Sequence, residues 1–523
     1  IAVQSFFDGV FGDPINIALG KDDVTNGRKE AKRFAEILAQ VRELTSEERF
    51  LNWQVAYPGV WSDWENDELA GGFDAVIGNP PWDRMKLQQV EWFAARRRDI
   101  ALAQRASDRQ RMIKALQDAG DPLARDFDKA EARADTGLRM ARQGGDYPLL
   151  SGGDTNLYSL FVERAMKLVK PNGMVGLLTP SGIVSDKTAT TIIKGVSTAG
   201  HLKALYDFEN GRQSVEQPPY FPDVHRSFKF CTFIASPERT FAGTKCAFYL
   251  HDIETLLDNQ RCFTLAAADF ARVNPNTGTA PIFKTRRDAE LTTAIYRNAS
   301  VLIDRSSGTE FKAWPVRYAT MFHMTNDSGL FRTRQELDER EGAYPIGGNH
   351  FKSKSGEWLP LYVGRMIHQF DHRAASVVVN EENIHNAAFS GEVTLAEKQD
   401  PDFTPEPQYW VAEQEVEFPA GFEWAIAFRD IARATDVRTI IASVVPKAGF
   451  GNKLPLLLPT DAAAYKSAGP LMLANLNALP FDFVARSKIH STSVNWYLAE
   501  QLSVIPLERY SSTRFGKKTA ALV

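Results

Sequence analysis

The sequence predicts an α/β fold, and three observations support that prediction. Residues 154–280 alternate between helical and strand-like stretches, as in a sheet whose strands are joined by helices. Apolar residues make up 44% of the 523 residues and charged residues 24%, which is an ordinary globular composition. A chain of this length is much longer than a typical domain, so two or more domains are expected.

Composition and periodicity divide the first part of the chain into two regions. Residues 1–82 mix short apolar runs with turns and end in GGFDAVIGNPPW, where residues 73–77 predict a buried strand that stops at Gly78 and two prolines. Residues 83–150 are rich in Arg, Ala, Gln and Asp, with apolar residues at helical spacing. We therefore expect a strand that runs into a rigid loop, followed by a helical insertion.

Two further regions complete the chain. Residues 151–280 contain the helical stretch LYSLFVERAMKLVK, a turn at residues 171–173, and the strand-like stretches MVGLLTP, LKALYDF and FKFCTFIA. In residues 281–523 the regular alternation is lost, and loops rich in aromatic and polar residues separate short strands and helices. These residues predict a second, mixed α/β domain.

Charge and cysteine usage exclude several classes of protein. The net charge is −4, so a DNA contact must come from a local patch and not from the bulk charge. The three cysteines, Cys231, Cys246 and Cys262, are too few and too scattered for a disulfide framework or a zinc site, and we expect small buried side chains in a cytoplasmic protein. No apolar run is long enough to span a bilayer, so no membrane contact is expected.

The segment Asn79-Pro80-Pro81-Trp82 predicts a preorganised polar site. Each proline fixes its own φ near −65° and keeps the preceding residue out of the helical region. The Asn79 side-chain oxygen and the Pro80 carbonyl could accept both hydrogens of an exocyclic amine such as adenine N6, while Trp82 stacks on the base, a contact worth about 1 to 3 kcal/mol. No strong general base is needed if the electrophile is a sulfonium methyl group. A turn that merely ends the strand is the alternative.

This segment resembles the catalytic motif of amino-methylating DNA methyltransferases, in the adenine-N6 group of the gamma order. Residues 156–184 resemble the helix, turn and strand that follow the catalytic loop in that group, and residues 220–235 resemble a later strand pair in which an aromatic residue beside a proline packs on the flipped base. The resemblance implies a Rossmann-like class I methyltransferase sheet, S-adenosylmethionine as cofactor, double-stranded DNA as partner, and base flipping.

The resemblance also implies individual roles. It assigns catalysis to the whole loop: Asn79, Pro80, Pro81 and Trp82. Asn79 would also contact the cofactor, and Phe221 would be the second residue that stacks on the base, opposite Trp82. Phe161 corresponds to an aromatic residue that packs near the adenine of S-adenosylmethionine, although a core position on an amphipathic helix would explain it equally well.

The C-terminal part looks more loosely like the large bacterial restriction and phage-defence methylases of the BREX-like and type IIG-like kind. In those enzymes the region after the catalytic domain recognises the target sequence, so residues 281–523 are expected to bind DNA. We expect Arg486, Lys488 and Asn495 to contact DNA, since Arg usually pairs with guanine and Asn with adenine. The stretch Arg96–Arg98 could contact phosphates, but a solvated helix explains it better.

One part of the family pattern is missing. The family binds its cofactor through a glycine-rich turn after the first strand, with an acidic residue at the end of the next strand. Residues 1–78 contain no F-x-G-x-G turn, and the segments 7–9 and 449–451 are expected to be loops. We therefore expect the glycine-rich motif in an upstream segment or on a partner chain, and other defence-system subunits are possible partners.

Together these features predict a site-specific DNA adenine-N6 methyltransferase of restriction-modification or antiviral defence. Two alternatives stay open: a non-catalytic DNA-recognition module that keeps the base pocket, and a cytosine-N4 methyltransferase. His368, Asp371 and His372 lie close enough in sequence to suggest a metal, but no third group of ligands supports one, so no metal is expected. No nuclease motif is evident, and the target sequence cannot be read from the chain.

Overall fold

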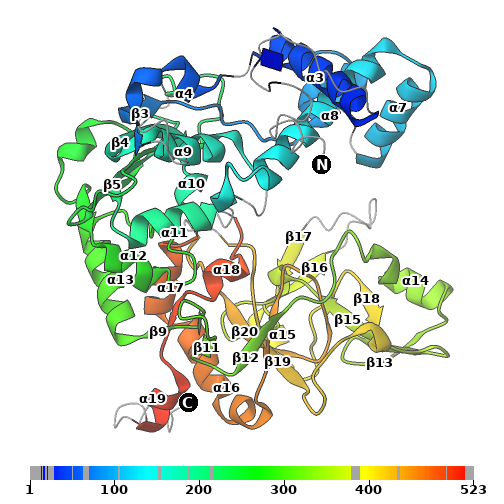
Figure 1. The fold of residues 1–523 in the computed structure, drawn as a ribbon. Coiled ribbons are helices and arrows are strands. Elements are labelled where there is room, and N and C mark those ends of the chain that lie inside the picture. The colour runs from blue at the N-terminus through cyan, green and yellow to red at the C-terminus, as the bar shows by residue number, and fades with distance from the viewer. Residues whose placement is uncertain are drawn as a thin grey trace. The chain divides into compact units, whose positions relative to one another are not determined.

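The computed structural model contains two compact units, Ile1–Phe73 and Asp74–Val523 (Figure 1). The residues that the structure describes are 13, 16–17, 21, 29–49, 51–62, 70–103, 106–150, 155–185, 189–212, 214, 216–378, 389–432, 436–489, 492–512 and 517. The segment 7–9 discussed above lies outside them.

An aromatic cluster organises the first unit. The rings of Trp53, Tyr57 and Trp61 lie edge-on around Phe73, with centroid distances of 6.0, 5.6 and 5.3 Å. The elements of this unit are α3 (Lys29–Glu48), α4 (Trp53–Ala56), η1 (Pro58–Val60), β1 (Trp61–Ser62) and β2 (Ala70–Gly71), and β1 pairs antiparallel with β2.

Helices form most of residues 89–150. They are α5 (Gln89–Ala94), α6 (Arg98–Ala101), α7 (Ala106–Asp118), α8 (Pro122–Gln143) and η2 (Pro148–Leu150). The longest, α8, begins where the Asp121 side chain accepts a hydrogen bond from the Leu123 N–H (2.9 Å), with Pro122 at its first position. A small core that includes Phe93 and Phe127 holds these helices together.

A six-stranded mixed sheet confirms the predicted α/β fold. Its order is β3-β4-β6-β5-β7-β8, with β6 antiparallel to both of its neighbours and β5 parallel to β7. The strands are β3 (Phe73–Gly78), β4 (Val169–Pro180), β5 (Leu202–Glu209), β6 (Lys229–Ala235), β7 (Thr244–Leu250) and β8 (Phe263–Leu265). The helical segments that accompany it are α9 (Leu157–Leu168), α10 (Gly182–Ser185), α11 (Thr190–Thr198), η4 (Glu254–Leu257), α12 (Ala267–Val273) and α13 (Arg286–Asn298).

The turn expected at residues 171–173 is wrong, because β4 runs through them. The Pro171 carbonyl accepts a hydrogen bond from the Glu238 N–H (3.1 Å) and another from the Ser236 hydroxyl (3.3 Å). Lys170 also forms an ion pair with Asp74 of β3. These long-range partners hold the segment extended where the local sequence favours a turn.

Among the described residues of 281–523, the two largest sheets have four and five strands. One has the order β12-β22-β19-β20 and the other β13-β14-β15-β18, with β21 parallel to β15. Their strands are β12 (Val316–Ala319), β13 (Tyr344–Gly347), β14 (His350–Ser353), β15 (Gly356–Tyr362), β18 (Trp410–Ala412), β19 (Trp424–Phe428), β20 (Ala442–Pro446), β21 (Gly449–Phe450) and β22 (Leu456–Pro459).

In the same described part of the chain, the shorter strands form three two-stranded sheets. The strands are β9 (Ser300–Val301), β10 (Ile303–Asp304), β11 (Phe311–Lys312), β16 (Ala375–Val378), β17 (Phe389–Glu392) and β23 (Ser503–Val504). The helices are η5 (Ser328–Leu330), α14 (Arg334–Glu339), η6 (Gly364–Met366), α15 (Leu395–Gln399), η7 (Glu413–Glu415), α16 (Ala462–Leu476), α17 (Leu479–Arg486), α18 (Trp496–Ala499) and α19 (Leu507–Ser512).

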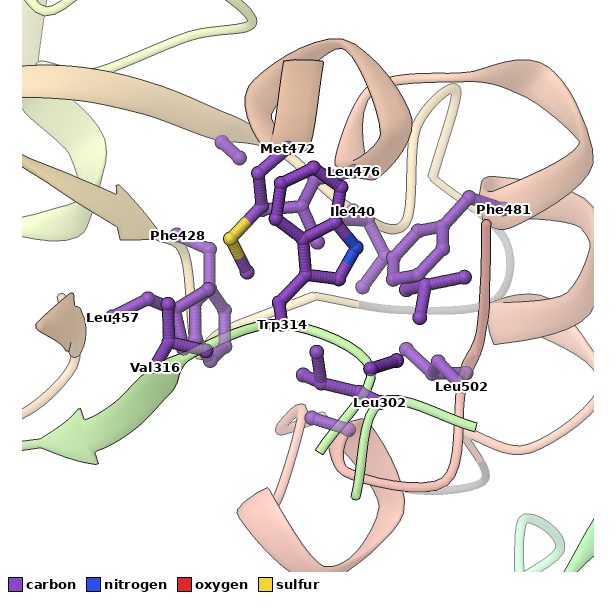
Figure 2. Packing of buried hydrophobic residues seen from close by; sticks show 14 of the residues in the cluster. Leu302, Trp314, Val316, Phe428, Ile440, Leu457, Met472, Leu476, Phe481 and Leu502 are labelled. Carbon is purple, nitrogen blue, oxygen red and sulfur yellow. The ribbon is translucent and has the colours of Figure 1, made fainter. Parts of the chain in front are cut away.

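The main core of this part surrounds Trp314, which is 2% exposed. Figure 2 shows its indole among Met472, Leu476, Ile440 and Phe481, so helices α16 and α17 pack against the segment that precedes β12. The indole N–H donates to the Ile505 carbonyl (3.0 Å), which satisfies its polar atom inside the core.

The segment 449–451, expected as a loop, instead begins with strand β21. A Cβ atom on Gly449 would lie 2.5 Å from Cγ1 of Val411 and 3.1 Å from Cδ1 of Leu361. Glycine is therefore needed here for close packing between β21 and its neighbours, which explains the motif without a cofactor.

The cysteine prediction agrees with the structure in part. Cys231 and Cys246 are free thiols with no exposure, as expected, whereas Cys262 is half-buried. Within the described residues, no helix is long and apolar enough to cross a membrane.

Candidate functional site

The loop of residues 79–82 leaves the end of β3 and is tied by backbone hydrogen bonds to the segment that begins α9. The Leu157 N–H donates to the Asp83 carbonyl (3.0 Å), and the Met85 N–H donates to the Thr155 carbonyl (3.2 Å). Strand β3 precedes the loop and α9 follows these bonds, so two rigid elements fix its position.

Asn79 and Trp82 contact each other within the loop. The Trp82 indole N–H donates a hydrogen bond of 3.1 Å to Oδ1 of Asn79. An indole nitrogen can only donate, so its partner must be the amide oxygen and not the amide nitrogen, which settles the orientation of the Asn79 amide. A carbonyl-type oxygen has two lone pairs, so Oδ1 keeps one acceptor position for another donor.

Trp82 also belongs to an aromatic cluster that includes Phe221, the second residue to which the resemblance assigns base stacking. The two ring centroids are 5.0 Å apart with an interplanar angle of 64°. Phe230 contacts both rings, at 6.3 Å from Trp82 and 5.1 Å from Phe221, and stacks on Phe208 at 5.4 Å. Trp82 and Phe221 are therefore in edge-to-face contact, with no gap between them wide enough for a third ring.

Asn210 is a residue of this cluster that sequence reasoning missed. It follows β5, is 1% exposed, and its side chain bonds to the backbone of Phe221 in both directions. A signal was present in the sequence, since an asparagine followed by a glycine directly after a strand is typical of a fixed turn.

Asp207 lies on β5 within the buried side of the sheet. It has no exposure, and burial raises the pKa of its carboxyl group to about 6, although a hydrogen bond from the Ser181 hydroxyl opposes that rise. Among the described residues its second oxygen, Oδ2, has no hydrogen-bond partner. Burial also raises the pKa of the nearby Tyr249 hydroxyl to about 12.

Phe161 projects from α9 with 47% of its surface exposed. The core side of this helix is formed by other residues, among them Tyr158, Val162 and Ala165, which are buried. This exposure excludes the core position that was the alternative for Phe161.

Lys488 is buried, so the expectation that it contacts DNA is wrong for this conformation. The residue is 2% exposed, and its ammonium group donates to the carbonyls of Val273 and Gln501 and lies 4.8 Å from the centre of the Tyr296 ring. Burial lowers its pKa well below the ordinary value. A charge with no access to solvent cannot reach a DNA phosphate.

Of the other two expected DNA contacts, Arg486 is half-buried and Asn495 is exposed. The guanidinium of Arg486 is hydrogen-bonded within the protein: Nε donates to Oδ2 of Asp482 (3.0 Å), and Nη2 donates to the carbonyls of Asp436 (2.7 Å) and Val437 (2.6 Å). Asn495 is exposed immediately before α18. The three residues are thus not brought together as one polar surface.

The basic stretch before and within α6 is partly neutralised. Arg97 forms hydrogen bonds of 2.9 and 2.8 Å with the two carboxylate oxygens of Asp99, and the guanidinium of Arg96 lies 4.4 Å from the centre of the Trp92 ring. Arg96 and Arg98 are exposed, so they keep access to solvent.

A cavity of about 380 Å³ in the C-terminal part offers cations that the sequence did not single out. Arg365, Arg429 and Lys453 line it, together with Met324, Val363, Gly364, Val377, Gln408 and Ile431. Lys453 is paired with Asp430 at 2.6 Å, while Nε of Arg429 is buried and has no hydrogen-bond partner among the described residues. Burial lowers the pKa of Arg429.

The positive charge of Arg429 also acts on His368. Burial lowers the pKa of His368, and Arg429 and Lys398 lower it further, while Asp371 opposes them. The Asp371 carboxylate is bound by Lys398 Nζ at 2.7 Å. In the part of the chain that the structure describes, no group of three or more potential metal ligands is present.

A family model matches two segments of the chain that contain the loop, Phe161 and Asn210. It is described as "Eco57I restriction-modification methylase" and covers residues 15–109 and 139–214, about a third of the chain. No curated protein matches the sequence.

Several solved structures resemble this chain weakly, with low sequence identity and low TM-scores. The match to a methyltransferase subunit of a type I restriction-modification system from Streptococcus thermophilus has 13% identity and a TM-score of 0.23, and covers 42% of this chain and 39% of that one. The type IIL restriction-modification enzyme MmeI, in complex with DNA, has 9% identity and a TM-score of 0.34, and the match covers 77% of this chain and 42% of that one. A nuclease-deletion mutant of the type ISP enzyme LlaGI, with a DNA substrate mimic, has 9% identity and a TM-score of 0.34, and the match covers 97% of this chain and 37% of that one.

The chain spans less than half of the length of each of these three proteins. Sequence identities of 9–13% and TM-scores of 0.23–0.34 say nothing about the function of this chain. In the segments that contain the loop of residues 79–82, the chain matches the restriction-modification methylases, a class of DNA methyltransferase.

Proposed function

We propose that the protein is a site-specific DNA adenine-N6 methyltransferase of a restriction-modification or phage-defence system. The main observation behind this proposal is the contact between Trp82 and Asn79, since the indole N–H turns the amide oxygen of Asn79 into a fixed acceptor. The loop follows a strand, contains two prolines and carries an aromatic ring beside that acceptor. A turn that merely ended the strand would need none of this polar geometry.

The chain's own groups would act on the amine in three ways. The free lone pair of Asn79 Oδ1 and the Pro80 carbonyl would accept the two hydrogens of the amino group, which concentrates the nitrogen lone pair on the side facing the electrophile. Trp82 and Phe221 would hold the flipped base by stacking, worth about 1 to 3 kcal/mol per contact. S-adenosylmethionine would supply the methyl group as a sulfonium, and no residue of the loop needs to act as a strong base.

The cofactor site would be formed in part by Phe161 and in part by residues outside this sequence. Phe161 fits the adenine ring, and Asn79 lies on the loop where the methyl group would arrive. The glycine motif at residues 449–451 is explained by packing, so we propose that the ribose and methionine groups are bound by an upstream segment or a partner chain.

Double-stranded DNA would be the partner, with the loop region methylating and the C-terminal part reading sequence. In the corresponding division of the chain, residues 1–82 and 151–280 form the methyltransferase part, residues 83–150 an insertion, and residues 281–523 the recognition part. Asn495 and Arg365, which lines the 380 Å³ cavity, are the better candidates for DNA contacts in that last part, because both are exposed, whereas Lys488 is buried and the donors of Arg486 are engaged.

The test is methyl transfer from radiolabelled S-adenosylmethionine to unmethylated phage genomic DNA, which offers most short target sites. The chain is assayed with and without its native upstream segment, and the labelled nucleoside is identified by mass spectrometry. N6-methyladenine is the expected product, and Asn79→Ala should abolish transfer with DNA affinity nearly unchanged. The control is Asn298→Ala, at the end of α13, where the side chain donates to the carbonyl of Ala294 (2.9 Å).

Each alternative has its own outcome in this assay. Labelled N4-methylcytosine would identify the cytosine enzyme. DNA binding without transfer by any form of the protein would identify a recognition module. Equal activity in wild type and Asn79→Ala would remove the loop from the chemistry altogether.

A further inference from the structure

Asn210 uses every polar group it has to hold one loop. Its backbone N–H donates to the Phe228 carbonyl (2.8 Å), and its own carbonyl accepts from the Tyr220 N–H (3.1 Å). Its side-chain Oδ1 accepts from the Phe221 N–H (2.8 Å), and Nδ2 donates to the carbonyls of Phe221 (3.0 Å) and Val224 (2.7 Å). The residue is 1% exposed, so these bonds are shielded from water.

Other contacts restrain the same loop. The Tyr220 hydroxyl donates to the His251 carbonyl (3.0 Å), and the guanidinium of Arg212 lies 4.5 Å from the centre of the Tyr220 ring. Arg226 donates to the carbonyls of Gln217 (2.9 Å) and Ser214 (3.0 Å). These contacts hold the flanks, whereas the Asn210 side chain bonds to both the N–H and the carbonyl of Phe221. The same carbonyl also accepts from the Val224 N–H (3.1 Å).

The backbone and the ring of Phe221 are therefore under different constraints. Both polar groups of its backbone are bonded to one buried side chain, while its ring is half-buried and packs against Trp82 at 5.0 Å. A base held between two parallel rings needs about 7 Å between them, so it could enter here only after a ring moves. The bonds from Asn210 to the Phe221 backbone would restrict that movement, at Phe221, to its side chain.

We propose that Asn210 is the positioning residue that locks the backbone of Phe221, so that its ring closes on the flipped base at a fixed distance from Asn79. The inference rests on the proposed function and extends it, because it names the residue that sets the geometry of the second stacking surface. Misplacement of a stacked base by about 1 Å relative to the reacting groups costs on the order of a hundredfold in rate.

The test combines amide exchange with methyl-transfer kinetics in the full chain and its upstream segment. In Asn210→Ala, peptides that span residues 218–228 should exchange at least about tenfold faster than in wild type, with the rest of the sheet unchanged. Asn210→Asp keeps an acceptor for the Phe221 N–H but sets a buried carboxylate oxygen against the carbonyls of Phe221 and Val224, so exchange should be at least as fast as in the alanine variant. The kcat for transfer to phage DNA should fall at least about tenfold in the alanine variant, and the KM for S-adenosylmethionine should change less than about twofold.

A matched control separates positioning from general stability. Asn274 is also buried, at 2% exposure, and its Nδ2 holds a different turn by donating to the Thr279 carbonyl (2.8 Å). Asn274→Ala should lower the Tm by a similar amount and leave kcat unchanged. If both alanine variants lose kcat in proportion to their stability, Asn210 is structural and the proposal is overturned.

Two further outcomes also overturn it. Unchanged exchange in Asn210→Ala would show that the loop does not depend on this side chain. Faster exchange with unchanged kcat would show that the restraint is not used in the reaction. A wild-type protein that transfers no methyl group contradicts the proposed function itself, and it is distinguished from these cases because the exchange measurement still reports on the loop.

Discussion

Replacement of Asp207 by asparagine should stabilise the protein in a manner that depends on pH. The carboxyl group has no exposure and its pKa is raised from 3.8 to about 6, chiefly by burial. A shift of roughly two units corresponds to about 3 kcal/mol between the two protonation states. Because the residue is almost completely buried, solvent screening should reduce this value little.

The sign follows from where the proton is held. Between pH 4 and 6 the folded protein keeps the proton of Asp207, while the unfolded chain has lost it. The folded state then binds more protons, so the free energy of unfolding of wild type falls as the pH rises through this window and is level again above it. Asparagine has no charge to bury, and its amide can still accept the hydrogen bond from Ser181.

The assay is urea unfolding of wild type and Asp207→Asn at pH values from 4 to 8. The advantage of the variant should be smallest near pH 4 and should grow by about 3 kcal/mol towards pH 7. Asp338→Asn, at an exposed position of α14, is the control for a general effect of removing a carboxylate. A difference between variant and wild type that is constant across the range would refute the reasoning.

Three further predictions concern single side chains. Trp82→Phe keeps a stacking ring but loses the donor that orients Asn79, so single-turnover methyl transfer should be slower than in wild type and faster than in Trp82→Ala; equal rates for both variants would contradict a role for the ring. Lys488→Met should leave DNA affinity within about twofold of wild type in fluorescence anisotropy, because the ammonium is buried; a larger loss would restore Lys488 as a contact. Arg365→Gln, at an exposed residue of the 380 Å³ cavity, should weaken binding to all duplexes and reduce the salt dependence by about one phosphate contact, and an unchanged slope would exclude it.

The positions of the main strands and the loop of residues 79–82 could be predicted because their causes are local. The expected burial of the strand at residues 73–77 is wrong, since β3 lies at the edge of the sheet and four of its six residues are exposed. Apolar runs bounded by Gly and Pro specify short strands, and two prolines specify the backbone around them without a partner. The pairing of Trp82 with Phe221 was predicted by resemblance to a family, since nothing in the spacing of the two residues brings them together.

The rest depends on contacts between distant segments. Lys488 looks like a surface residue in the sequence, but Val273 and Gln501 supply its partners, 215 and 13 residues away. Gly449 looks like a loop residue, yet the approach of Val411 requires it in a strand. Asn210 has its partners up to 18 residues downstream, in a loop whose fold no periodicity specifies.

The contact between the rings of Trp82 and Phe221 has a consequence for selectivity. If the proposed function holds, a base that enters this site does not gain stacking on a bare surface: it competes with an aromatic pair that is already satisfied. The net stacking free energy gained when a base enters is then only the difference between base–ring stacking and ring–ring contact. Stacking alone therefore discriminates poorly between one base and another. The base would instead be selected by the hydrogen bonds between its amino group and the two oxygens that accept its hydrogens. A base without an amino group would displace the rings and form neither of these hydrogen bonds.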